Sequence, residues 1–283
     1  GTLPDCRRTD KLVNGLHEVN NRSRKINGFW ALAGDYDPHS GDSHQQDSSA
    51  LLANASAKIA AMKVLNIATT TVVAPKGAVR ELTLSDGTVV VLNAGSKISY
   101  PVSFYGSERK VKLTGEAFFN VAKDIAHPFV VTAGDMVATV LGTQFDLNAW
   151  KEDNVMLTLV SGLVRVRDRR DNGRMAMVWP GQSATLGVDD NITTAEADTT
   201  LALKWKNGIF AFANTKITDA IDEINRWYGV SIQIDRALPA SHTLTLEQPR
   251  STGLKALVDV ICKENGMQAV YKGDEIMLMR VDD

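Results

Sequence analysis

The chain has 283 residues, of which 44% are hydrophobic and 23% charged, the proportions of an ordinary soluble globular protein with room for two domains. Its formal net charge of −2 provides no concentrated positive field, which excludes nucleic acid and anionic membrane surfaces as expected partners. No stretch reaches the ~18 uninterrupted apolar residues that a membrane span needs, and no signal peptide is recognisable.

The ends of the chain carry two further signals. Gly1 has no initiator Met before it, so we expect the chain to be part of a longer protein. Cys6 and Cys262 could pair in principle, but Cys262 lies on the apolar stripe of a predicted helix. This position favours a buried free thiol over a disulfide, and cysteine usage therefore does not define the redox compartment.

Residues 1–66 are predicted to be a partly helical N-terminal extension. Apolar residues have helical spacing at residues 12–19, and residues 51–67 are rich in good helix formers. Between them lies an acidic, turn-rich stretch at residues 34–44, whose carboxylates could suit a hard cation. Pro38 and the missing downstream Glu spoil an EF-hand match, so we expect an exposed loop.

Residues 67–203 are predicted to form an all-β domain. Short runs rich in β-branched and aromatic residues recur there, bounded by Gly, Asp, Asn or Pro. Asp86-Gly87 predicts a tight hairpin, because a type I′ turn needs the positive φ that Gly adopts without strain. Further turns are expected at Gly115, Gly142 and Gly162. The turn spacing is irregular, and either a short-stranded sandwich or a solenoid-like stack of hairpins fits it.

One basic cluster stands out within this region. Four arginines fall within residues 165–170 and are followed by Asp171-Asn172-Gly173. The interleaved acids and the turn signal predict a charged, solvated hairpin end, which we prefer to a nucleic-acid patch.

Residues 204–283 are predicted to form a small α+β module of order β-α-β-β-α-β. A strand at residues 209–212 precedes a helix that begins near Thr218 and stops at Gly229. Strands are expected at residues 230–235 and 243–246, a second helix from near Thr252 to Gly266, and a closing hairpin over residues 268–279. Helices of this kind need a sheet to cover, which favours a compact module.

No constellation of residues predicts catalysis. Asp86 and Glu116 could be paired glycosidase carboxylates, but Asp86 is better explained as a turn residue and Glu116 as a local acceptor or a partner of Arg109. The five histidines lack metal-binding spacing, no serine lies in a nucleophile elbow, and Gly142-Thr143 precedes a strand and not a helix. We therefore predict a protein that is not an enzyme, with no catalytic, metal-binding or cofactor-binding residues and no cofactor.

Three tryptophans leave an alternative open. Trp150, Trp179 and Trp205 could line a carbohydrate-binding face, although such residues more often fill a core or a domain seam. The alternative function is therefore a β-rich glycan-binding module with an appended interaction domain.

Several motifs in a specific order carry a family resemblance over residues 72–283. They include Leu84-Ser-Asp-Gly-Thr88, Leu92-Asn-Ala-Gly-Ser96, Gly115-Glu-Ala-Phe118, His127-Pro-Phe-Val130, Leu141-Gly-Thr-Gln-Phe145 and Pro180-Gly-Gln182. In this order the chain resembles the periplasmic part of FecR-type anti-sigma regulators. The region from Trp205 onward is similar to the module that follows the FecR domain, which has the layout of the short N-terminal domain of secretins and TonB-dependent receptors.

The resemblance implies a role in signalling. The chain would be the periplasmic portion, at the inner membrane, of a single-pass anti-sigma factor that controls an extracytoplasmic-function sigma factor. Its partners would be the N-terminal signalling domain of a TonB-dependent outer-membrane transporter and, through a cytoplasmic domain absent from this chain, the sigma factor. Contact with the membrane would be made only by a transmembrane helix that this chain also lacks.

The transporter's domain is expected to add a strand to an exposed sheet edge of the 204–283 module. Two strands are candidates for this edge because their alternation leaves one polar face. Their central residues are Ile232, Gln233 and Ile234 in the first and Thr243, Leu244 and Thr245 in the second. The sequence does not identify which of the two strands has an unpaired edge.

Overall fold

The computed structural model describes residues 51–57, 68–171, 173–235, 239, 241–273 and 275–281. The chain divides into two compact units, Gly1–Lys58 and Ile59–Asp283. Residues 51–57 of the first unit form a helix, whereas the predicted helix at residues 12–19, the acidic stretch at residues 34–44 and Cys6 lie outside the described residues. Among the residues described, none of the helices combines the length and apolar character needed to cross a bilayer.

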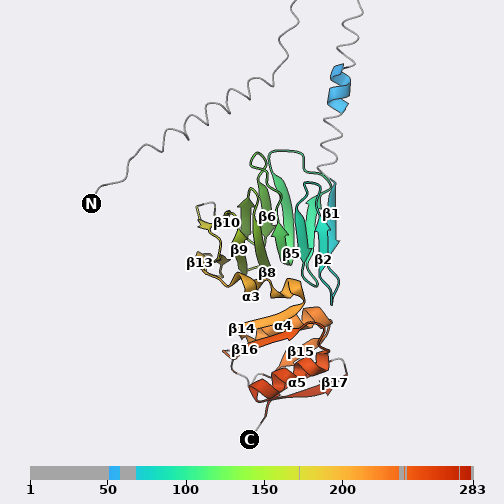
Figure 1. Ribbon diagram of the computed structural model, residues 1–283, viewed down its shortest axis with the longest axis vertical. Helices are drawn as coiled ribbons and strands as arrows, with labels where there is room; N and C mark the ends of the chain where they lie inside the picture. The colour runs from blue at the N-terminus through green and yellow to red at the C-terminus, as the bar shows by residue number, and fades with distance from the viewer. Residues whose placement is uncertain are drawn as a thin grey trace, which may run out of the picture. The chain divides into compact units, whose positions relative to one another are not determined.

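The second unit begins with thirteen short strands, β1 to β13 (Figure 1). They are β1 (Thr69–Val73), β2 (Arg80–Thr83), β3 (Val89–Leu92), β4 (Lys97–Pro101), β5 (Arg109–Asn120), β6 (Phe129–Ala133), β7 (Met136–Val140), β8 (Gln144–Lys151), β9 (Asn154–Ser161), β10 (Val164–Asp168), β11 (Met175–Val178), β12 (Gln182–Leu186) and β13 (Ile192–Glu196). The predicted mainly β character of this region is confirmed.

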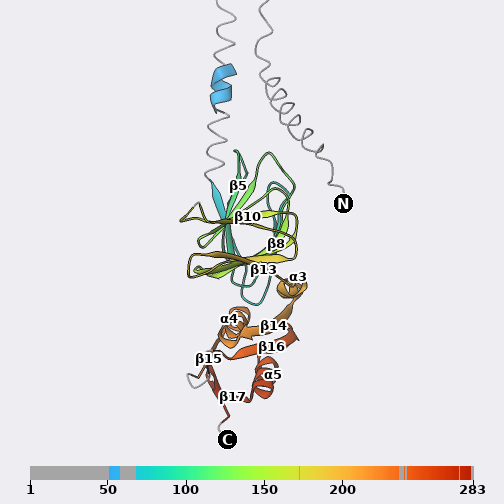
Figure 2. The ribbon, with the colours of Figure 1, turned by 90° about the vertical axis from the view of Figure 1, so that its left-hand side faces the viewer.

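These strands form two sheets that share β5, and together we call them the sandwich. The first sheet contains β1, β4, the first half of β5, β6, β7, β10 and β11, and the second contains β2, β3, the second half of β5, β8, β9, β12 and β13. Figure 2 shows the sandwich from the side on which β10 and β13 lie. Of the two predicted arrangements, the sandwich is therefore the one observed.

Gly115 is the point at which β5 passes from one sheet to the other. The prediction of a turn there was wrong, because β5 continues through Gly115 as one strand of twelve residues. Gly115 has a φ of +91°, which bends the strand where the pairing with β4 ends and that with β8 begins. The Ser96 Oγ accepts a hydrogen bond of 2.9 Å from the Glu116 N–H and holds the bend in place.

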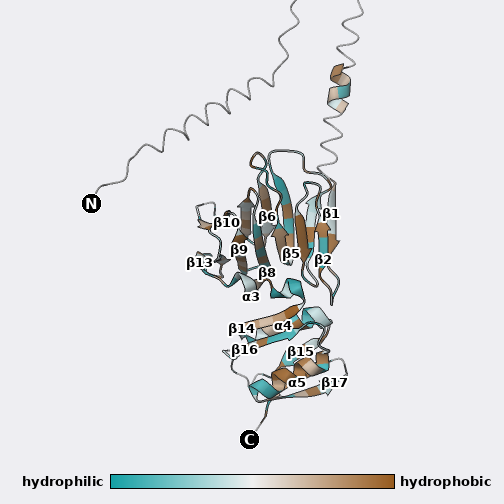
Figure 3. Ribbon diagram, in the orientation of Figure 1, coloured by the Kyte–Doolittle hydropathy of each residue, from teal (hydrophilic) through white to brown (hydrophobic). Residues whose placement is uncertain are grey.

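One hydrophobic core lies between the two sheets. Alternating residues of the strands point into it because successive side chains of a strand face opposite sides. At its centre the rings of Phe119 and Phe145 stack with centroids 5.0 Å apart, and Phe129 packs beside Phe119. Hydrophobic residues accordingly concentrate on the sandwich strands and on α5 in Figure 3.

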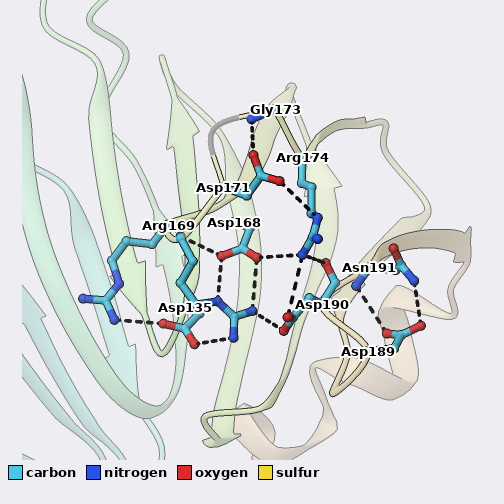
Figure 4. A network of polar contacts seen from close by, with 10 residues as sticks. Asp135, Asp168, Arg169, Asp171, Gly173, Arg174, Asp189, Asp190 and Asn191 are labelled. Atoms are coloured by element: carbon cyan, nitrogen blue, oxygen red, sulfur yellow. Dashed lines mark hydrogen bonds and ion pairs between the residues drawn. The ribbon is translucent and has the colours of Figure 1, made fainter.

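The basic cluster at residues 165–170 lies in the hairpin of β10 and β11, as predicted. Figure 4 shows the polar network at the end of this hairpin, with Asp168 at its centre. The buried Asp168 carboxylate accepts two bonds of 3.1 Å from the Arg170 guanidinium, and Arg170 also pairs with Asp190 at 2.6 Å. These pairs neutralise Arg170, and its hydrogen bond to Asp168 is the main cause that lowers the pKa of the Asp168 carboxylate.

Replacing Asp168 by Ala is expected to lower the free energy of unfolding by ~1–2 kcal/mol, because Arg170 loses its buried acceptor but can still be hydrated. Urea unfolding followed by circular dichroism would measure the change. Asp189→Ala is the matched control in the next loop, where the carboxylate binds only Asn191. An equal loss in the two variants would contradict a special role for Asp168.

The rest of the second unit is a small α+β module that follows two short helical turns. The turns are α3 (Thr199–Ala202) and η1 (Lys204–Asn207), and the module contains β14 (Ile209–Lys216), α4 (Ile217–Tyr228), β15 (Ser231–Ile234), β16 (Thr243–Pro249), α5 (Leu254–Asn265), β17 (Met267–Lys272) and β18 (Glu275–Arg280). The predicted layout is confirmed, and the predicted closing hairpin is formed by β17 and β18. Both helices stop at the predicted residues, Gly229 and Gly266.

The module has its own core between two small sheets. β14 pairs with β16, while β15, β18 and β17 form a three-stranded sheet in that order. The apolar faces of α4 and α5 pack into this core, and the predicted burial of Cys262 on α5 is confirmed. Burial raises the pKa of the Cys262 thiol and keeps it protonated.

Candidate functional site

The sandwich and the α+β module meet across a layer of polar and charged side chains, which we call the seam. Its sandwich residues are Asn93, Glu116, Asp146, Asn148 and Trp150, and its other residues are Trp205, Lys206, Glu223, Arg226 and Arg250. Charged groups in such a layer are costly to bury unless each of them has a partner. The seam is therefore held by specific pairs and not by apolar contact alone.

Arg250 is the residue that joins the two sides of the seam. Its side chain is 2% exposed, and it follows directly after β16, where its N–H donates to the Gly208 carbonyl at 2.7 Å. One guanidinium nitrogen donates to the Asn93 Oδ1 of the sandwich at 2.8 Å, and another pairs with the Glu223 carboxylate of α4. The same guanidinium lies between two aromatic rings, 4.8 Å from Phe210 and 4.6 Å from Trp227.

Glu116 is the sandwich's buried carboxylate at the seam. It accepts hydrogen bonds from the Asn93 Nδ2 at 2.5 Å and from the Asn148 Nδ2 at 2.9 Å. The predicted pairing with Arg109 was wrong: Arg109 binds Asp86 at 2.6 Å instead. Arg109 and Glu116 lie seven residues apart on the continuous strand β5, a separation of about 23 Å at ~3.3 Å per residue, so their side chains cannot meet.

The carboxylates of the seam hold protons more tightly than ordinary ones. Burial, followed by the charge of the neighbouring Glu116, raises the pKa of Glu223 to about 7 from its ordinary 4.5. Burial also raises the pKa of Glu116, opposed by its bond from Asn93 and by the charge of Arg250. The pKa of Asp146 is raised well above its usual range by burial and by Glu116.

These raised pKa values predict a protein that gains stability as the pH falls from about 7.5 to about 5. The pKa of Glu223 is higher in the folded state than in the unfolded state, so the folded state binds more protons between pH 4.5 and about 7. The stability that this proton contributes is fully present below pH 4.5 and is lost as the pH rises through about 7. The charges facing Glu223 are Arg250, Arg226 and Glu116. Urea unfolding at several pH values would measure this slope, and Glu223→Gln should flatten it. A slope unchanged by Glu223→Gln would contradict the assignment.

Two tryptophans of the seam contact polar or charged groups. Trp205 is buried and its Nε1 donates to the Asp146 Oδ1 at 3.2 Å, while the Arg226 guanidinium lies 4.2 Å from the Trp150 ring. The prediction that tryptophans fill a core or seam is thus confirmed for these two. It was wrong for Trp179, which follows β11 and is 58% exposed. The three rings do not form one exposed row of the kind that a glycan-binding face would use.

The other candidate acids have structural partners. The Asp86 carboxylate closes its own turn by accepting from the Thr88 N–H at 3.0 Å, and it also binds Arg109, so the turn prediction is confirmed. Asp86 and Glu116 therefore have separate sets of partners. Within the described ranges no group of three or more His, Cys, Asp or Glu residues is arranged to hold a metal ion.

The first predicted partner strand, at residues 232–234, is β15. It pairs with β18 on one side only, so its other side is an edge among the described strands. Ile232 is buried in the module core, and the side chain of Asn225 binds both its N–H, at 2.8 Å, and its carbonyl, at 3.0 Å. Asn225 thus occupies part of the edge. Gln233 is exposed, and Ile234 is partly buried.

The second predicted partner strand, at residues 243–245, is β16. The main-chain groups of its even-numbered residues point toward β14. Two bonds next to the strand show this: the His242 carbonyl accepts from the Ile217 N–H, and the Arg250 N–H donates to the Gly208 carbonyl. Main-chain groups of successive residues point to opposite sides, so Thr243 and Thr245 direct theirs to the edge away from β14. Leu244 is buried in the core, whereas Thr245 is exposed. No described strand pairs with this edge.

Sequence reasoning did not identify Arg250 or Asn93 as seam residues. They are 157 positions apart and meet only because the module packs on the sandwich. One signal was available: Arg250 follows Pro249 directly after a strand with alternating residues, which places a charged residue at the end of that strand. Such a residue is usually solvated, and nothing in its sequence context indicates burial.

Comparison with known proteins agrees with this architecture. The family model for the FecR protein matches residues 70–167, and that for the FecR C-terminal region matches residues 209–278, together more than half of the chain. Two crystal structures of a protein from Parabacteroides distasonis ATCC 8503, assigned as an anti-sigma factor, have TM-scores of 0.70 and 0.69 at 27% identity. They cover 76% and 75% of this chain and 100% of their own chains. No curated protein matches the chain.

Proposed function

Because this chain belongs to the FecR family of anti-sigma regulators, we propose that it is the periplasmic signalling portion of a transmembrane anti-sigma factor at the inner membrane. The signal comes from the N-terminal domain of a TonB-dependent transporter, and the output is control of an extracytoplasmic-function sigma factor by a cytoplasmic domain. The FecR domain corresponds to residues 67–203 and the module to residues 204–283, after an N-terminal extension at residues 1–66. The role is regulatory and not enzymatic.

The edge of β16 is the observation that supports the docking step. An unpaired edge offers main-chain donors and acceptors to an incoming strand, and alternate side chains add specificity. At this edge Thr243 and Thr245 provide the main-chain groups, whereas the Thr245 hydroxyl accepts a hydrogen bond of 3.0 Å from the Asn214 N–H of β14. On β15 the Asn225 side chain already binds Ile232, so β16 is the better edge.

The seam connects β16, where the partner strand would dock, to the sandwich through Arg250. β16 ends at Pro249, and the next residue is Arg250, which binds Asn93. A strand paired to β16 restrains the backbone that positions Arg250. Docking can therefore shift the balance between a closed and a loosened seam, as any ligand does when it prefers one of two states.

The test is a calorimetric titration of this chain with the purified N-terminal domain of a TonB-dependent transporter from the same organism. Thr243→Pro removes an N–H on the free edge and is expected to weaken binding by about tenfold or more, because a main-chain hydrogen bond is lost and the proline ring blocks the approach. Wild-type affinity in this variant would refute docking at β16.

Thr194→Pro is the matched control. It makes the same change on β13, the edge strand of the second sheet, at a residue whose main-chain groups also point away from its partner β12. Thermal unfolding of both variants separates loss of binding from loss of fold. No binding of the transporter domain to the wild-type chain would refute the proposed signalling input itself.

A further inference from the structure

The outer face of the first sheet carries many hydroxyl and cationic residues, together with two valines and two methionines. The register places one transverse row across all seven strands, formed by Thr71, Ser99, Lys112, Thr132, Val137, Arg167 and Met175. The neighbouring row contains Lys110, Val130, Thr139, Arg165 and Met177. We call the surface formed by these two rows and Lys97 the cationic face.

The charge of this face is one-sided. Its strand positions carry five cations, Lys97, Lys110, Lys112, Arg165 and Arg167, and no acidic residue. This contrasts with the formal net charge of −2 for the whole chain. A local excess of positive charge on a protein of opposite net sign marks a surface that attracts anionic groups.

Nearby acids neutralise this charge only in part. Glu108 pairs with Lys110 at 2.8 Å, and Asp135 pairs with Arg169 at 2.8 Å, outside the strand positions. Lys97, Lys112 and Arg165 make no ion pair with any residue that the structure describes. These three cations are therefore available to a partner.

Part of the face is hollowed into a groove. The groove has a volume of ≈ 870 Å³, and its lining includes hydroxyl and cationic residues of β1, β4, β5 and β6, such as Thr71, Ser99 and Lys112. Its lining also includes three acids, Glu108, Asp135 and Glu152, of which Glu108 pairs with Lys110 and Asp135 with Arg169. The hydroxyls and the unpaired Lys112 suit the oxygen atoms of an extended chain. A groove of this size accommodates several residues of such a chain.

The far end of the face is apolar. Met175 and Met177 of β11 are 58% and 44% exposed, and the exposed Trp179 is the next residue of the same alternation. Methionine, tryptophan and arginine are enriched at protein interfaces. An apolar anchor beside cations fits a polypeptide better than it fits a polysaccharide or a phosphate backbone.

We propose that the cationic face is a docking surface for an acidic, extended polypeptide segment of a partner protein. Its carboxylates pair with Lys112 and Arg165, and an apolar side chain packs on Met175 and Met177. This surface lies on the sandwich and is separate from the β16 edge, so it does not depend on the proposed docking of the transporter domain.

The test is fluorescence anisotropy at low salt with a labelled twelve-residue peptide that alternates Glu and Val. Lys112→Glu/Arg165→Glu is expected to weaken binding by about tenfold or more, because reversing two charges turns attraction into repulsion. Lys263→Glu/Lys272→Glu is the matched control: it makes the same charge change at exposed positions of α5 and β17, and binding should stay within about twofold of the wild type.

A second comparison isolates the apolar end. A peptide that alternates Glu and Ser should bind more weakly than the Glu-Val peptide, and Met175→Ser/Met177→Ser should remove most of that difference. Lys112→Gln/Arg165→Gln, which only neutralises the charges, should give an intermediate loss if the reversed variant fails to fold.

Three outcomes would overturn the proposal. One is the absence of Glu-Val peptide binding to the wild-type chain at low salt, and another is equal weakening by the control variant. The third is preference for another anion, shown by tighter binding of a single-stranded dodecanucleotide or of phosphatidylglycerol vesicles.

Discussion

Replacing Arg250 by Met is expected to lower the free energy of unfolding by ~3 kcal/mol, the lower end of the cost of removing one member of a buried ion pair, because Arg250 is buried but Glu223 is 24% exposed. Methionine keeps much of the side-chain volume between Phe210 and Trp227 but leaves Glu223 and the Asn93 Oδ1 without their cationic partner. Urea unfolding followed by tryptophan fluorescence measures the change, and Trp227 reports on the site itself.

Lys255→Met is the control for this prediction. Lys255 pairs with Asp259 on the exposed side of α5, and such surface pairs contribute at most ~1 kcal/mol. The double variant Arg250→Met/Glu223→Gln should recover part of the loss, because no uncompensated carboxylate is then buried at that position. A loss for Arg250→Met no larger than that for Lys255→Met would show that the seam is not held by this arginine.

Replacing Gly115 by Ala should cost ~3 kcal/mol or more, through backbone strain and overpacking together. Its φ of +91° is unfavourable for any residue with a Cβ, and a Cβ there would lie 2.6 Å from the Ser96 Oγ and 2.9 Å from the Trp150 ring. Neither neighbour can move freely, because Ser96 is buried at the bend and Trp150 packs on Arg226 at the seam. Thermal and urea unfolding would measure the loss.

Gly87→Ala separates the two causes. Gly87 has a similar φ of +84°, but nothing lies within 4 Å of the position that a Cβ would occupy. Its replacement should therefore cost only the backbone strain, about 1 kcal/mol. Equal costs at the two glycines would mean that the contacts with Ser96 and Trp150 relax at no cost, contrary to the close packing expected there.

The two predictions concern connected parts of one structure. Gly115 places Glu116 at the seam, and Arg250 crosses the seam to Asn93, which also binds Glu116. The bend in β5 and the arginine after β16 thus meet in one hydrogen-bonded chain. In the proposed signalling function, these hydrogen bonds link the β16 edge to the sandwich.

The local elements and the fold class can be predicted from the amino-acid sequence. Asp86-Gly87 predicted its hairpin because the turn's backbone conformation is a property of those two residues, and Gly229 and Gly266 predicted the helix ends for the same reason. The order of motifs from Leu84 onward identified the family, which the matches over residues 70–167 and 209–278 show.

The roles of Gly115, Glu116 and Arg250 depend on how distant strands pair and pack. A glycine after an apolar run is compatible with a turn or with a bend, and the choice depends on which strands pair on either side of it. The partners of Glu116 and Arg250 come from distant segments, and the pairing of buried charges depends on how those segments pack. Local backbone preferences can be read along the chain, whereas the burial of a charge is decided by contacts that no short stretch of sequence contains.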